Sequence, residues 1–512
     1  MEAMTLAHLL PDRASTEPAI VDEAANVTIS YRALFDQVEH LAQRLCGAGL
    51  DRGAGVALVL PNGVESLVVG LALARAGLIT VPLNPAYTAS ELRRLITKVG
   101  ARAIVTGHRN VVLSDIATAL GLPIWASSVD RTGNVSLAGM RRSASGASTA
   151  EPSAGDVALY LHTSGTEGPP KVVPLTHANV LLSARQIAAH YALTPADRTL
   201  VVLPLFHGHG LIGAALATLA SGGAVIVPPR FSASRFWPSF VEHRATWYTA
   251  VPTIHQILLA RADADSAPPS GARFIRSCSS ALPAAVFAGL ERRFGAPVLE
   301  AYGLTEASHQ VASNPLPPRT RKAGSVGFGT GVQIAILDAE GHTLPAHRAG
   351  EVVVRGPSVM QAYRDDAAAS AAAFVDGWFR TGDVGALDEN GYLTLTGRIK
   401  EMINRGGEKI SPTEIEAALL AHPAVAEAAA FAVPDAKYGE AVGAAVVLKS
   451  DSDPDELRSF CRERLADFMV PSVIRILPAL PRNALGKVER RALAEWICSR
   501  VEAISAPGGS RI

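Results

Sequence analysis

Apolar and polar positions alternate in two different ways along the first 300 residues. Short runs rich in Val, Ile and Leu are apolar on both faces, whereas the segments between them repeat their apolar residues at helical spacing. Within 28–48, Leu34, Val38, Leu41 and Leu45 share one helix face, and Gly47 stands where helices commonly end. Strands that are apolar on both faces and alternate with helices predict parallel sheets covered on both sides. We therefore expect an α/β fold.

The same alternation places the individual elements. Strands are predicted at 54–63, 79–85, 101–107, 157–161, 198–206, 245–253, 272–280 and 297–303, and helices at 65–76, 89–99, 177–191 and 284–295. The segment 127–155 is rich in Ser, Gly and Ala and is predicted to be a surface loop. Residues 199–229 carry no charge, but Pro, His and Gly interrupt them. A strand at 200–203, a buried helix at 211–220 and a strand at 224–227 are therefore favoured over a membrane span.

The pattern changes after Val332 to short β-runs and turns, with the turn signal Asp-Glu-Asn-Gly at 388–391, which predicts a meander. After Arg398, helices are predicted at 412–421, 455–465 and 490–501, and strands at 425–433 and 441–448. These elements form a module of about 110 residues, a normal domain size. A chain of 512 residues is too long for one core, so we expect at least two domains.

A cluster of small polar residues follows the predicted strand 157–161. Backbone N–H groups and hydroxyls of such residues can wrap an anion, and a lysine adds a charge that reaches phosphate oxygens. An ordinary polar turn remains an alternative at this point. The cluster is not a GxxxxGK[ST] P-loop, because Val172 follows the lysine and no glycine directly precedes it. The candidate residues are Thr163, Ser164, Gly165, Thr166, Glu167, Gly168 and Lys171.

Charge and cysteine usage narrow the class of protein. Forty-seven basic and 47 acidic side chains balance, so nothing suggests a nucleic-acid or anionic-membrane partner. The four cysteines have no metal-ligand spacing and are interpreted as reduced thiols of a cytoplasmic protein. The N-terminus has no basic region before an apolar core, so no secretory signal is expected. Ser510-Arg511-Ile512 resembles a peroxisomal address, which is the alternative location.

Further polar motifs follow in order. In the stretch 300–306, Tyr302 offers an aromatic face for a base, and Thr305 and Glu306 offer oxygen ligands for a hard cation. Asp383 in a Gly-flanked loop can accept two hydrogen bonds from a ribose, although for this motif alone a plain Asp turn is the favoured interpretation. Arg398 can join Asp383 there. Near the end, Lys487 stands on a short Gly-bearing loop, where a solvated lysine is the simpler interpretation.

Together and in this order, these blocks resemble the adenylate-forming acyl-CoA synthetases, over roughly residues 29–493. The resemblance implies an N-terminal domain (1–397) of parallel βα sheets plus a small β-barrel-like subdomain, a hinge (398–400) at Lys400, and a small mobile α+β lid domain (401–512). It also implies ATP, Mg²⁺ and coenzyme A as cofactors, and a small carboxylic acid as substrate. No nucleic-acid partner and no stable membrane insertion are expected.

The resemblance also implies roles for individual residues. The cluster from Thr163 to Lys171 would bind the β- and γ-phosphates, Thr166 and Glu306 the Mg²⁺, Asp383 and Arg398 the ribose, and Gly406 and Gly407 the CoA. Lys487 would bridge the α-phosphate and the substrate carboxylate, and His207 would gate the acyl pocket. Glu167 stands where Thr or Ser is usual, and Val172 where Gly is usual. The negative charge of Glu167 beside a polyphosphate would either weaken ATP binding or recruit the metal. The nucleotide would also contact Glu300, Ala301, Tyr302, Gly303 and Thr305.

A narrower resemblance concerns the acid. The stretches 245–259, 273–283, 306–318 and 404–416 look like the oxalate–CoA ligase branch. Fatty-acyl pockets have apolar walls, whereas Ser279, Ser280 and His309 would offer hydrogen bonds to a second carboxylate. A serine-rich turn and a solvent-facing histidine are the plainer interpretation of the same residues. Other short, medium-chain or aryl acids stay open.

Three other functions were weighed. An adenylating enzyme of the peptide-synthetase type would load a carrier domain, and none is expected after Val501. A non-catalytic CoA or nucleotide sensor would release no AMP with any acid. A dinucleotide-binding oxidoreductase would need a helix after the glycine-rich run 324–331, but the following residues predict a strand.

Overall fold

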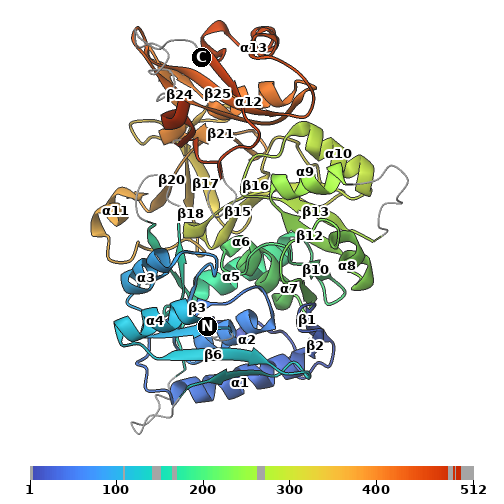
Figure 1. Ribbon diagram of the computed structural model, residues 1–512, viewed down its shortest axis with the longest axis vertical. Helices are drawn as coiled ribbons and strands as arrows, with labels where there is room; N and C mark the ends of the chain where they lie inside the picture. Colours follow the sequence, from blue (N-terminus) through green and yellow to red (C-terminus); the bar gives the residue numbers. More distant parts are fainter. Residues whose placement is uncertain are drawn as a thin grey trace, which may run out of the picture. The chain divides into compact units, whose positions relative to one another are not determined.

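The computed structural model describes residues 4–107, 110–140, 151–163, 170–261, 271–482, 488–490 and 492–497 (Figure 1). The chain forms two compact units. The first consists of residues 1–163, 170–334 and 354–379, and the second of residues 164–169, 335–353 and 380–512.

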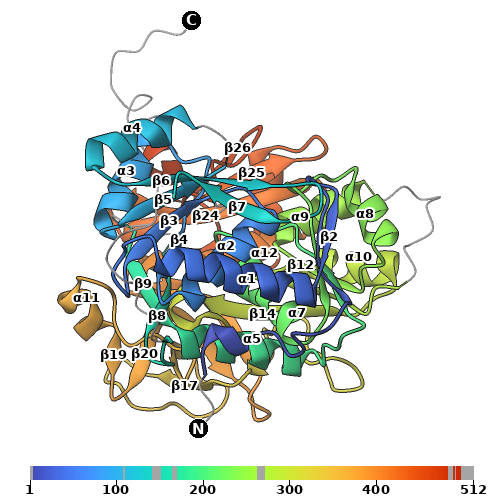
Figure 2. The ribbon, with the colours of Figure 1, turned by 90° about the horizontal axis from the view of Figure 1, so that it is seen from below.

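A seven-stranded sheet organises the first part of the chain. Its order is β7-β6-β5-β3-β4-β8-β9; the five central strands are parallel, and the two edge strands β7 and β9 are antiparallel to their neighbours. The helices α3 (Ala89–Lys98) and α4 (Val111–Leu120) lie beside β5 and β6 in Figure 2, and they bury leucines and isoleucines against the sheet. The strands are β3 (Gly55–Val59), β4 (Ile79–Pro82), β5 (Ala103–Thr106), β6 (Ile124–Val129), β7 (Val135–Ala138), β8 (Val157–His162) and β9 (Val172–Thr176).

A nine-stranded sheet completes the first unit, in the order β16-β15-β14-β13-β12-β10-β11-β1-β2. The strands from β14 to β1 along this order are parallel, whereas β2, β15 and β16 are antiparallel additions. The strands are β1 (Pro18–Asp22), β2 (Val27–Ser30), β10 (Arg198–Leu200), β11 (Ala224–Val227), β12 (Trp247–Ala250), β13 (Phe274–Ser277), β14 (Val298–Leu304), β15 (His309–Ser313) and β16 (Phe328–Gly329).

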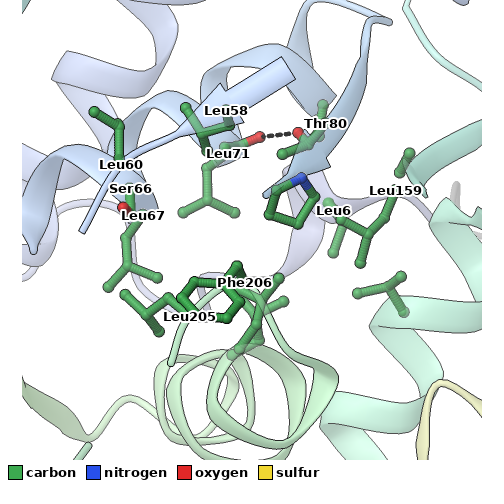
Figure 3. Close-up of a pocket in the computed structure, with 17 residues that line it drawn as sticks. Leu6, Leu58, Leu60, Ser66, Leu67, Leu71, Thr80, Leu159, Leu205 and Phe206 are labelled. Carbon is green, nitrogen blue, oxygen red and sulfur yellow. Dashed lines mark hydrogen bonds between the residues drawn. The ribbon is translucent and has the colours of Figure 1, made fainter. Parts of the chain in front are cut away.

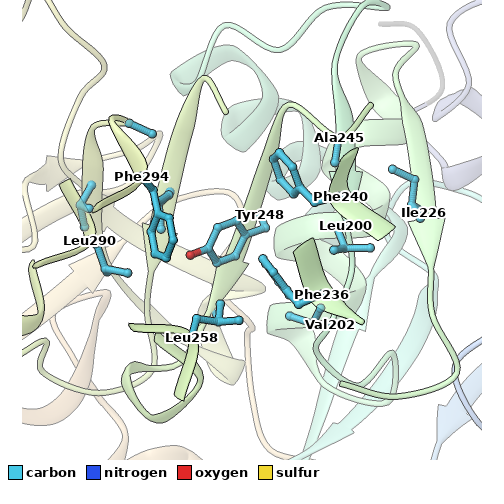
Figure 4. Packing of buried hydrophobic residues seen from close by; sticks show 14 of the residues in the cluster. Leu200, Val202, Ile226, Phe236, Phe240, Ala245, Tyr248, Leu258, Leu290 and Phe294 are labelled. Atoms are coloured by element: carbon cyan, nitrogen blue, oxygen red, sulfur yellow. The ribbon is translucent and has the colours of Figure 1, made fainter. Parts of the chain in front are cut away.

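The two faces of this sheet differ in chemistry. Tyr248 on β12 and Ile275 on β13 pack with aromatic and aliphatic side chains from α8 (Phe236–Glu242), α9 (Pro252–Ala260) and α10 (Ala284–Phe294) (Figure 4). Because successive side chains of a strand point to opposite faces, Thr249 and Arg276 lie on the other face. Their positions are paired across β12 and β13. This second face of the sheet therefore carries buried polar side chains, among them Arg276.

The charge-free stretch after β10 folds as predicted into a buried helical segment, but with an unexpected local geometry. It begins with α6 (Gly208–Gly210), widens into the π-helical turn η2 (Leu211–Leu216) and ends with α7 (Ala217–Ala220). Single π-turns often occur at functional sites. An apolar cavity lies between this segment and the strands β3, β4 and β8, lined by Leu58, Leu60, Leu67, Leu71 and Phe206, among others (Figure 3).

The remaining helices cover these sheets. They are α1 (Tyr31–Cys46), α2 (Val64–Arg75), α5 (His177–His190) and α11 (Ala367–Ala372), with short 3₁₀ turns η1 (Leu6–His8) and η3 (Thr305–Ala307). The Thr88 side chain and Glu91 form a capping box at the start of α3, which satisfies otherwise unpaired N–H groups.

The predicted β-meander forms a five-stranded sheet of order β17-β18-β20-β19, with β21 pairing to β20. Its strands are β17 (Gln333–Leu337), β18 (Gly350–Arg355), β19 (Phe374–Val375), β20 (Trp378–Leu387) and β21 (Leu393–Arg398). The last sheet has the order β23-β22-β25-β24, with β26 beside β25. It consists of β22 (Ile403–Arg405), β23 (Glu408–Ile410), β24 (Val425–Asp435), β25 (Gly439–Leu448) and β26 (Val473–Ile476), packed with α12 (Pro412–Leu420) and α13 (Pro454–Arg462). Residues 490 and 492–497 are helical.

One expectation was wrong, and one strand was missed. The segment 127–155 is not simply a loop, because β6 continues to Val129 and β7 pairs with it in an antiparallel hairpin. Trp125, Ser127 and Leu137 are buried there, so small residues in the sequence hide a packed edge. The strand β1 was not predicted at all. Within the described residues, no helix is long and apolar enough to cross a membrane.

Candidate active site

Arg276 is the centre of a buried polar cluster on the nine-stranded sheet. The side chain is fully buried, and all five of its N–H groups have acceptors. Nε donates to the Tyr191 hydroxyl (2.8 Å); Nη1 donates to His209 Nε2 and Thr249 Oγ1, and Nη2 to His309 Nε2 and Gln310 Oε1 (each 2.9 Å). Every one of these acceptors is electrically neutral.

The cluster fixes the protonation of two histidines. A guanidinium only donates, so Nε2 of His209 and of His309 must be the unprotonated nitrogen, and each proton sits on Nδ1. His209 Nδ1 then donates to Ser279 Oγ over 2.9 Å. Burial lowers the pKa of both imidazoles well below the ordinary value, and the positive charge of Arg276 adds to the effect. The two rings stack with centroids 4.8 Å apart.

Glycines make room for the His309 ring. A Cβ at Gly213, in the π-turn, would stand 2.4 Å from His309 Nε2, and a Cβ at Gly303 would stand 3.4 Å from His309 Nδ1. His309 and Ser308 both have positive φ (88° and 53°), a conformation that non-glycine residues adopt only when their surroundings impose it. The imidazole is therefore held from both sides, with Nδ1 directed toward the strand β14.

Lys171, Tyr363 and Glu306 form a second cluster in the same unit. The Tyr363 hydroxyl donates to Glu306 Oε1 over 2.8 Å, and Lys171 Nζ lies 4.5 Å from the centre of the Tyr363 ring. Burial and the Glu306 carboxylate raise the pKa of Tyr363, so the hydroxyl stays protonated. Tyr363 thus contacts both a lysine, which can hold phosphate oxygens, and a half-buried carboxylate, which can bind a hard cation.

The predicted phosphate loop connects β8 to β9. The backbone N–H of Thr163 donates to the Lys171 carbonyl (3.0 Å), and the Lys171 N–H donates to Thr163 Oγ1 (3.1 Å), which closes the base of the loop. Ser164, Gly165, Thr166, Glu167 and Gly168 lie outside the described residues, and their predicted roles stay predictions. The same holds for Lys487.

The strand β14 carries the predicted nucleotide segment. Ala301 and Tyr302 are buried, and Gly303 pairs with Gln310 of β15, so the segment runs beside the Arg276 cluster. Thr305 and Glu306 follow directly in η3. Glu300 Oε2 accepts the Gly324 N–H (2.9 Å), but burial raises the pKa of this carboxyl to about 7. The contacts of residues 300–305 with a nucleotide stay predictions.

The second unit brings together the pair that was predicted for the ribose. Asp383 and Arg398 are partners across β20 and β21, and Arg398 Nε lies 2.9 Å from Asp383 Oδ1. Gly406 and Gly407 form the turn between β22 and β23, both with positive φ. Lys400 is exposed in the 3₁₀ turn η4 (Ile399–Glu401). Their predicted roles toward ribose, CoA and hinge motion stay predictions.

Sequence comparison assigns the chain to a family. A family model described as AMP-binding enzyme matches residues 11–364, and one described as AMP-binding enzyme C-terminal domain matches residues 414–487. The chain belongs to the AMP-binding enzyme family.

Named relatives span nearly the whole AMP-binding enzyme. A protein named "probable CoA ligase" from Humulus lupulus is 44% identical (94% of this chain and 93% of the relative are covered). Proteins named oxalate–CoA ligase are 42% identical in Arabidopsis thaliana (97% and 99% covered) and 40% identical in Saccharomyces cerevisiae (94% and 95% covered). The crystal structure of ATP-bound MatB from Rhodopseudomonas palustris aligns with a TM-score of 0.89 at 32% identity, covering 97% of this chain and 99% of MatB.

The predicted acid-binding residues of this AMP-binding enzyme are only partly brought together. Ser279 and His309 belong to the Arg276 cluster, and His309 is buried rather than solvent-facing, so the plainer interpretation of His309 was wrong. Ser280 is exposed and donates to the Ser279 carbonyl. His207 caps α6 and contacts the Phe206 ring, with centroids 4.7 Å apart.

Sequence reasoning missed three residues that organise these sites. His209 is the second histidine of Pro-Leu-Phe-His-Gly-His-Gly, and only the first was chosen. Arg276 stands in a predicted buried strand. Its position was a usable signal, because an arginine is seldom fully buried unless polar partners surround it. Tyr363 lies 57 residues after Glu306, and no local pattern links them.

His209, Cys278 and His309 also bring three possible metal-ligand atoms within 4.8 Å of one another. Both histidines, however, already use Nε2 to accept from Arg276. A second cation beside a buried guanidinium would be repelled. The cluster is therefore better suited to an anion.

Proposed function

We propose that this AMP-binding enzyme is an ATP-dependent acid–CoA ligase that converts oxalate to oxalyl-CoA, with release of AMP and pyrophosphate. Acid–CoA ligation is the chemistry named for the relatives that span the whole chain. The observation that supports a small dicarboxylate is the Arg276 cluster, which sets polar hydrogen-bond donors and a positive charge where a fatty-acyl pocket would have apolar walls.

The first half-reaction activates the acid. A carboxylate is a poor electrophile, so one oxygen of the acid attacks the α-phosphorus of ATP, the bond to the β-phosphate bridging oxygen breaks, and pyrophosphate leaves. Two negatively charged groups must meet, so the site needs positive charge. Lys171 would hold the β- and γ-phosphates with Thr163, Ser164, Gly165, Thr166 and Gly168, and Lys487 would bridge the α-phosphate and the attacking carboxylate.

The described residues fit a magnesium ion. Glu306 offers one carboxylate oxygen, its other oxygen is positioned by Tyr363, and hard oxygen donors are what Mg²⁺ prefers. Mg²⁺ bound there, with Thr166 as a further ligand, would neutralise charge on the phosphates. The Tyr363 hydroxyl keeps the Glu306 side chain oriented toward this role.

Two separate sets of residues are candidates for the nucleoside. We assign the base to the segment Glu300–Thr305, with the Tyr302 ring as its stacking surface. We assign the ribose to Asp383, whose carboxylate can accept two hydroxyl hydrogen bonds and also pairs with Arg398.

The second half-reaction transfers the acyl group. The thiolate of CoA attacks the acyl carbon of the adenylate, the bond to the phosphate oxygen breaks, and AMP leaves. Lys487 is not needed for this step, so a C-terminal domain (401–512) can turn about Lys400 and bring Gly406 and Gly407 to the CoA. His207 would open or close the acyl pocket between the two steps.

The apolar cavity beside Phe206 and Leu205 favours a second candidate, a ligase for a medium-chain or aryl acid. A substrate panel distinguishes the two. Oxalate, malonate, octanoate and coumarate are compared by release of AMP with ATP, Mg²⁺ and CoA present. The proposal expects the highest kcat/KM with oxalate; a preference for octanoate or coumarate would replace it with the second candidate, and no AMP with any acid would favour a sensor.

A further inference from the structure

We propose that Arg276 is a positioning residue that turns the donor nitrogens of His209 and His309 outward and supplies the unbalanced positive charge that selects acids with two negative groups. The inference rests on the proposed function and deepens it, because it names the feature of the site that distinguishes a dicarboxylate from a monocarboxylate of the same size.

The charge of Arg276 is unbalanced by its surroundings. Its five acceptors are a phenol, two neutral imidazoles, a threonine hydroxyl and a primary amide. Among the residues that the structure describes, no carboxylate forms an ion pair with Arg276, although the side chain is fully buried. A buried charge without a counter-charge is costly, and it strongly favours any anion that can come near.

The orientation of the two imidazoles directs their Nδ1–H groups away from Arg276 and toward the proposed acid site. Each Nε2 is occupied by the guanidinium, so each Nδ1–H points away from Arg276. His209 Nδ1 reaches Ser279, which is exposed just after β13. His309 Nδ1 lies against Gly303, in the strand that leads to Glu306. Two polarised donors, His309 Nδ1–H and the Ser279 hydroxyl, therefore border the region assigned to the acid.

A second negative group has a particular need for this arrangement. Formation of the adenylate consumes the charge of one carboxylate of a dicarboxylic acid, and the other carboxylate stays ionised through both half-reactions. Water is displaced from it when it binds, so its charge must be met by fixed donors and a nearby cation. An acid with one carboxylate has no such group, and the charge of Arg276 gives it less advantage.

Gln310 offers a way to cancel the charge without changing the geometry. Its Oε1 accepts from Arg276 Nη2, and its Nε2 donates to Thr330 Oγ1 over 3.2 Å. In Gln310→Glu a carboxylate of the same shape would face the guanidinium, and the Thr330 hydroxyl could donate to it. Gln333 is a matched control, because its Oε1 accepts two N–H groups of Arg355 (3.1 and 2.9 Å) at an exposed position.

The test compares kcat/KM of AMP release for oxalate and for glyoxylate, which also has two carbons but carries one carboxylate and one charge. Q310E is expected to lower the value for oxalate by about 30-fold and for glyoxylate by less than about threefold, as the loss of one charge–charge interaction predicts. Q333E is expected to change neither by more than about twofold, since exposed pairs matter little. Q310E should also melt at a higher temperature than wild type, because its carboxylate pairs with Arg276.

The outcomes separate the two proposals. If wild type prefers another dicarboxylate, oxalate is wrong as the substrate, and the same comparison is made with that acid and its one-carboxylate analogue. If wild type prefers the acids with one carboxylate, both proposals fail. If wild type prefers the dicarboxylate and Q310E loses activity equally with both acids, loses none, or melts lower, the role of Arg276 is overturned and the substrate proposal stands. Arg276→Met, which removes the charge itself, must lower the same ratio.

Discussion

The fully buried Arg276 and the half-buried Arg490 have opposite surroundings. Arg490 donates to the Glu416 carboxylate from Nε and Nη2 (2.9–3.1 Å) and to Glu401 from Nη1 (3.0 Å). Arg276 donates only to neutral acceptors. The charge of Arg490 is balanced by two carboxylates, and these ion pairs connect η4 to α12. The charge of Arg276 has only neutral partners. A buried arginine without a carboxylate partner favours the binding of an anion nearby, which is the basis of the proposal for Arg276.

Substitution of Lys487 has the largest expected effect on activity. Unlike Arg276 and Arg490, this residue is proposed to contact the reacting groups directly. Lys487→Ala removes the charge proposed to meet both the α-phosphate and the acid, so adenylate formation should fall by about 10²–10³-fold. Thioester formation from supplied adenylate should be spared. Rapid-quench assays of the two half-reactions check this, with the exposed Lys449→Ala as control. Equal losses in both halves would refute the division of labour.

Arg490→Met tests the structural side of the comparison. It would leave two carboxylates without their partner. Breaking a fully buried ion pair in this way costs about 3–5 kcal/mol, and the partial exposure of Arg490 and Glu401 lowers the expected loss below that range. Burial already raises the pKa of Glu416, which shows how little solvent helps it. Denaturant unfolding should show this loss, whereas the oxalate-to-glyoxylate ratio of the remaining folded enzyme should not change. Arg235→Met, which breaks an exposed pair with Glu242, is the control. A changed ratio would mean that the two arginines do not divide their tasks as proposed.

Glu300 is a buried acidic residue, and its burial disfavours the charged form of the carboxyl group. Its pKa is about 7 in the folded protein and 4.5 ordinarily, so the folded state holds the proton more tightly. The stability from Glu300 is fully present below pH 4.5 and is lost as the pH rises through 7, by about 3 kcal/mol. Unfolding free energies at several pH values should show this fall in wild type and a smaller one in Glu300→Gln. Parallel curves for the two proteins would contradict it.

Tyr363→Phe gives the smallest expected effect. It removes one hydrogen bond to Glu306, worth about 1 kcal/mol, or roughly a fivefold rise in the Mg²⁺ concentration needed for half-maximal rate. Preference among acids should stay unchanged, since Tyr363 lies outside the Arg276 cluster. Magnesium titrations of wild type, Y363F and the control Tyr87→Phe measure this. A shift in acid preference without a shift in magnesium dependence would be inconsistent with the proposed role.

Part of this account was accessible from the sequence. The parallel strands followed from apolar runs, and the positions of Lys171, Glu306, Asp383 and Arg398 followed from motifs in which chemistry-bearing residues are neighbours in the chain. The hairpin of β6 and β7 was missed because its buried residues include Ser127, which resembles a loop residue.

The residues that organise the site were missed for a different reason. Arg276 contacts residues from 85 positions before it to 34 after it, and Tyr363 reaches Glu306 across 57 positions. Such contacts depend on the order of strands in the sheet and leave no periodic pattern. The left-handed backbone at Ser308 and His309, which aims the imidazole at Arg276, was equally invisible, because neither residue is a glycine.

The most direct test of the central claim is the ratio of kcat/KM for oxalate to that for glyoxylate, measured side by side in wild-type and Q310E protein. The account predicts a high ratio in wild type that falls by about tenfold or more in Q310E, in a protein that is at least as stable. An unchanged ratio in stable Q310E protein would contradict the claim that the unbalanced charge of Arg276 selects the acid.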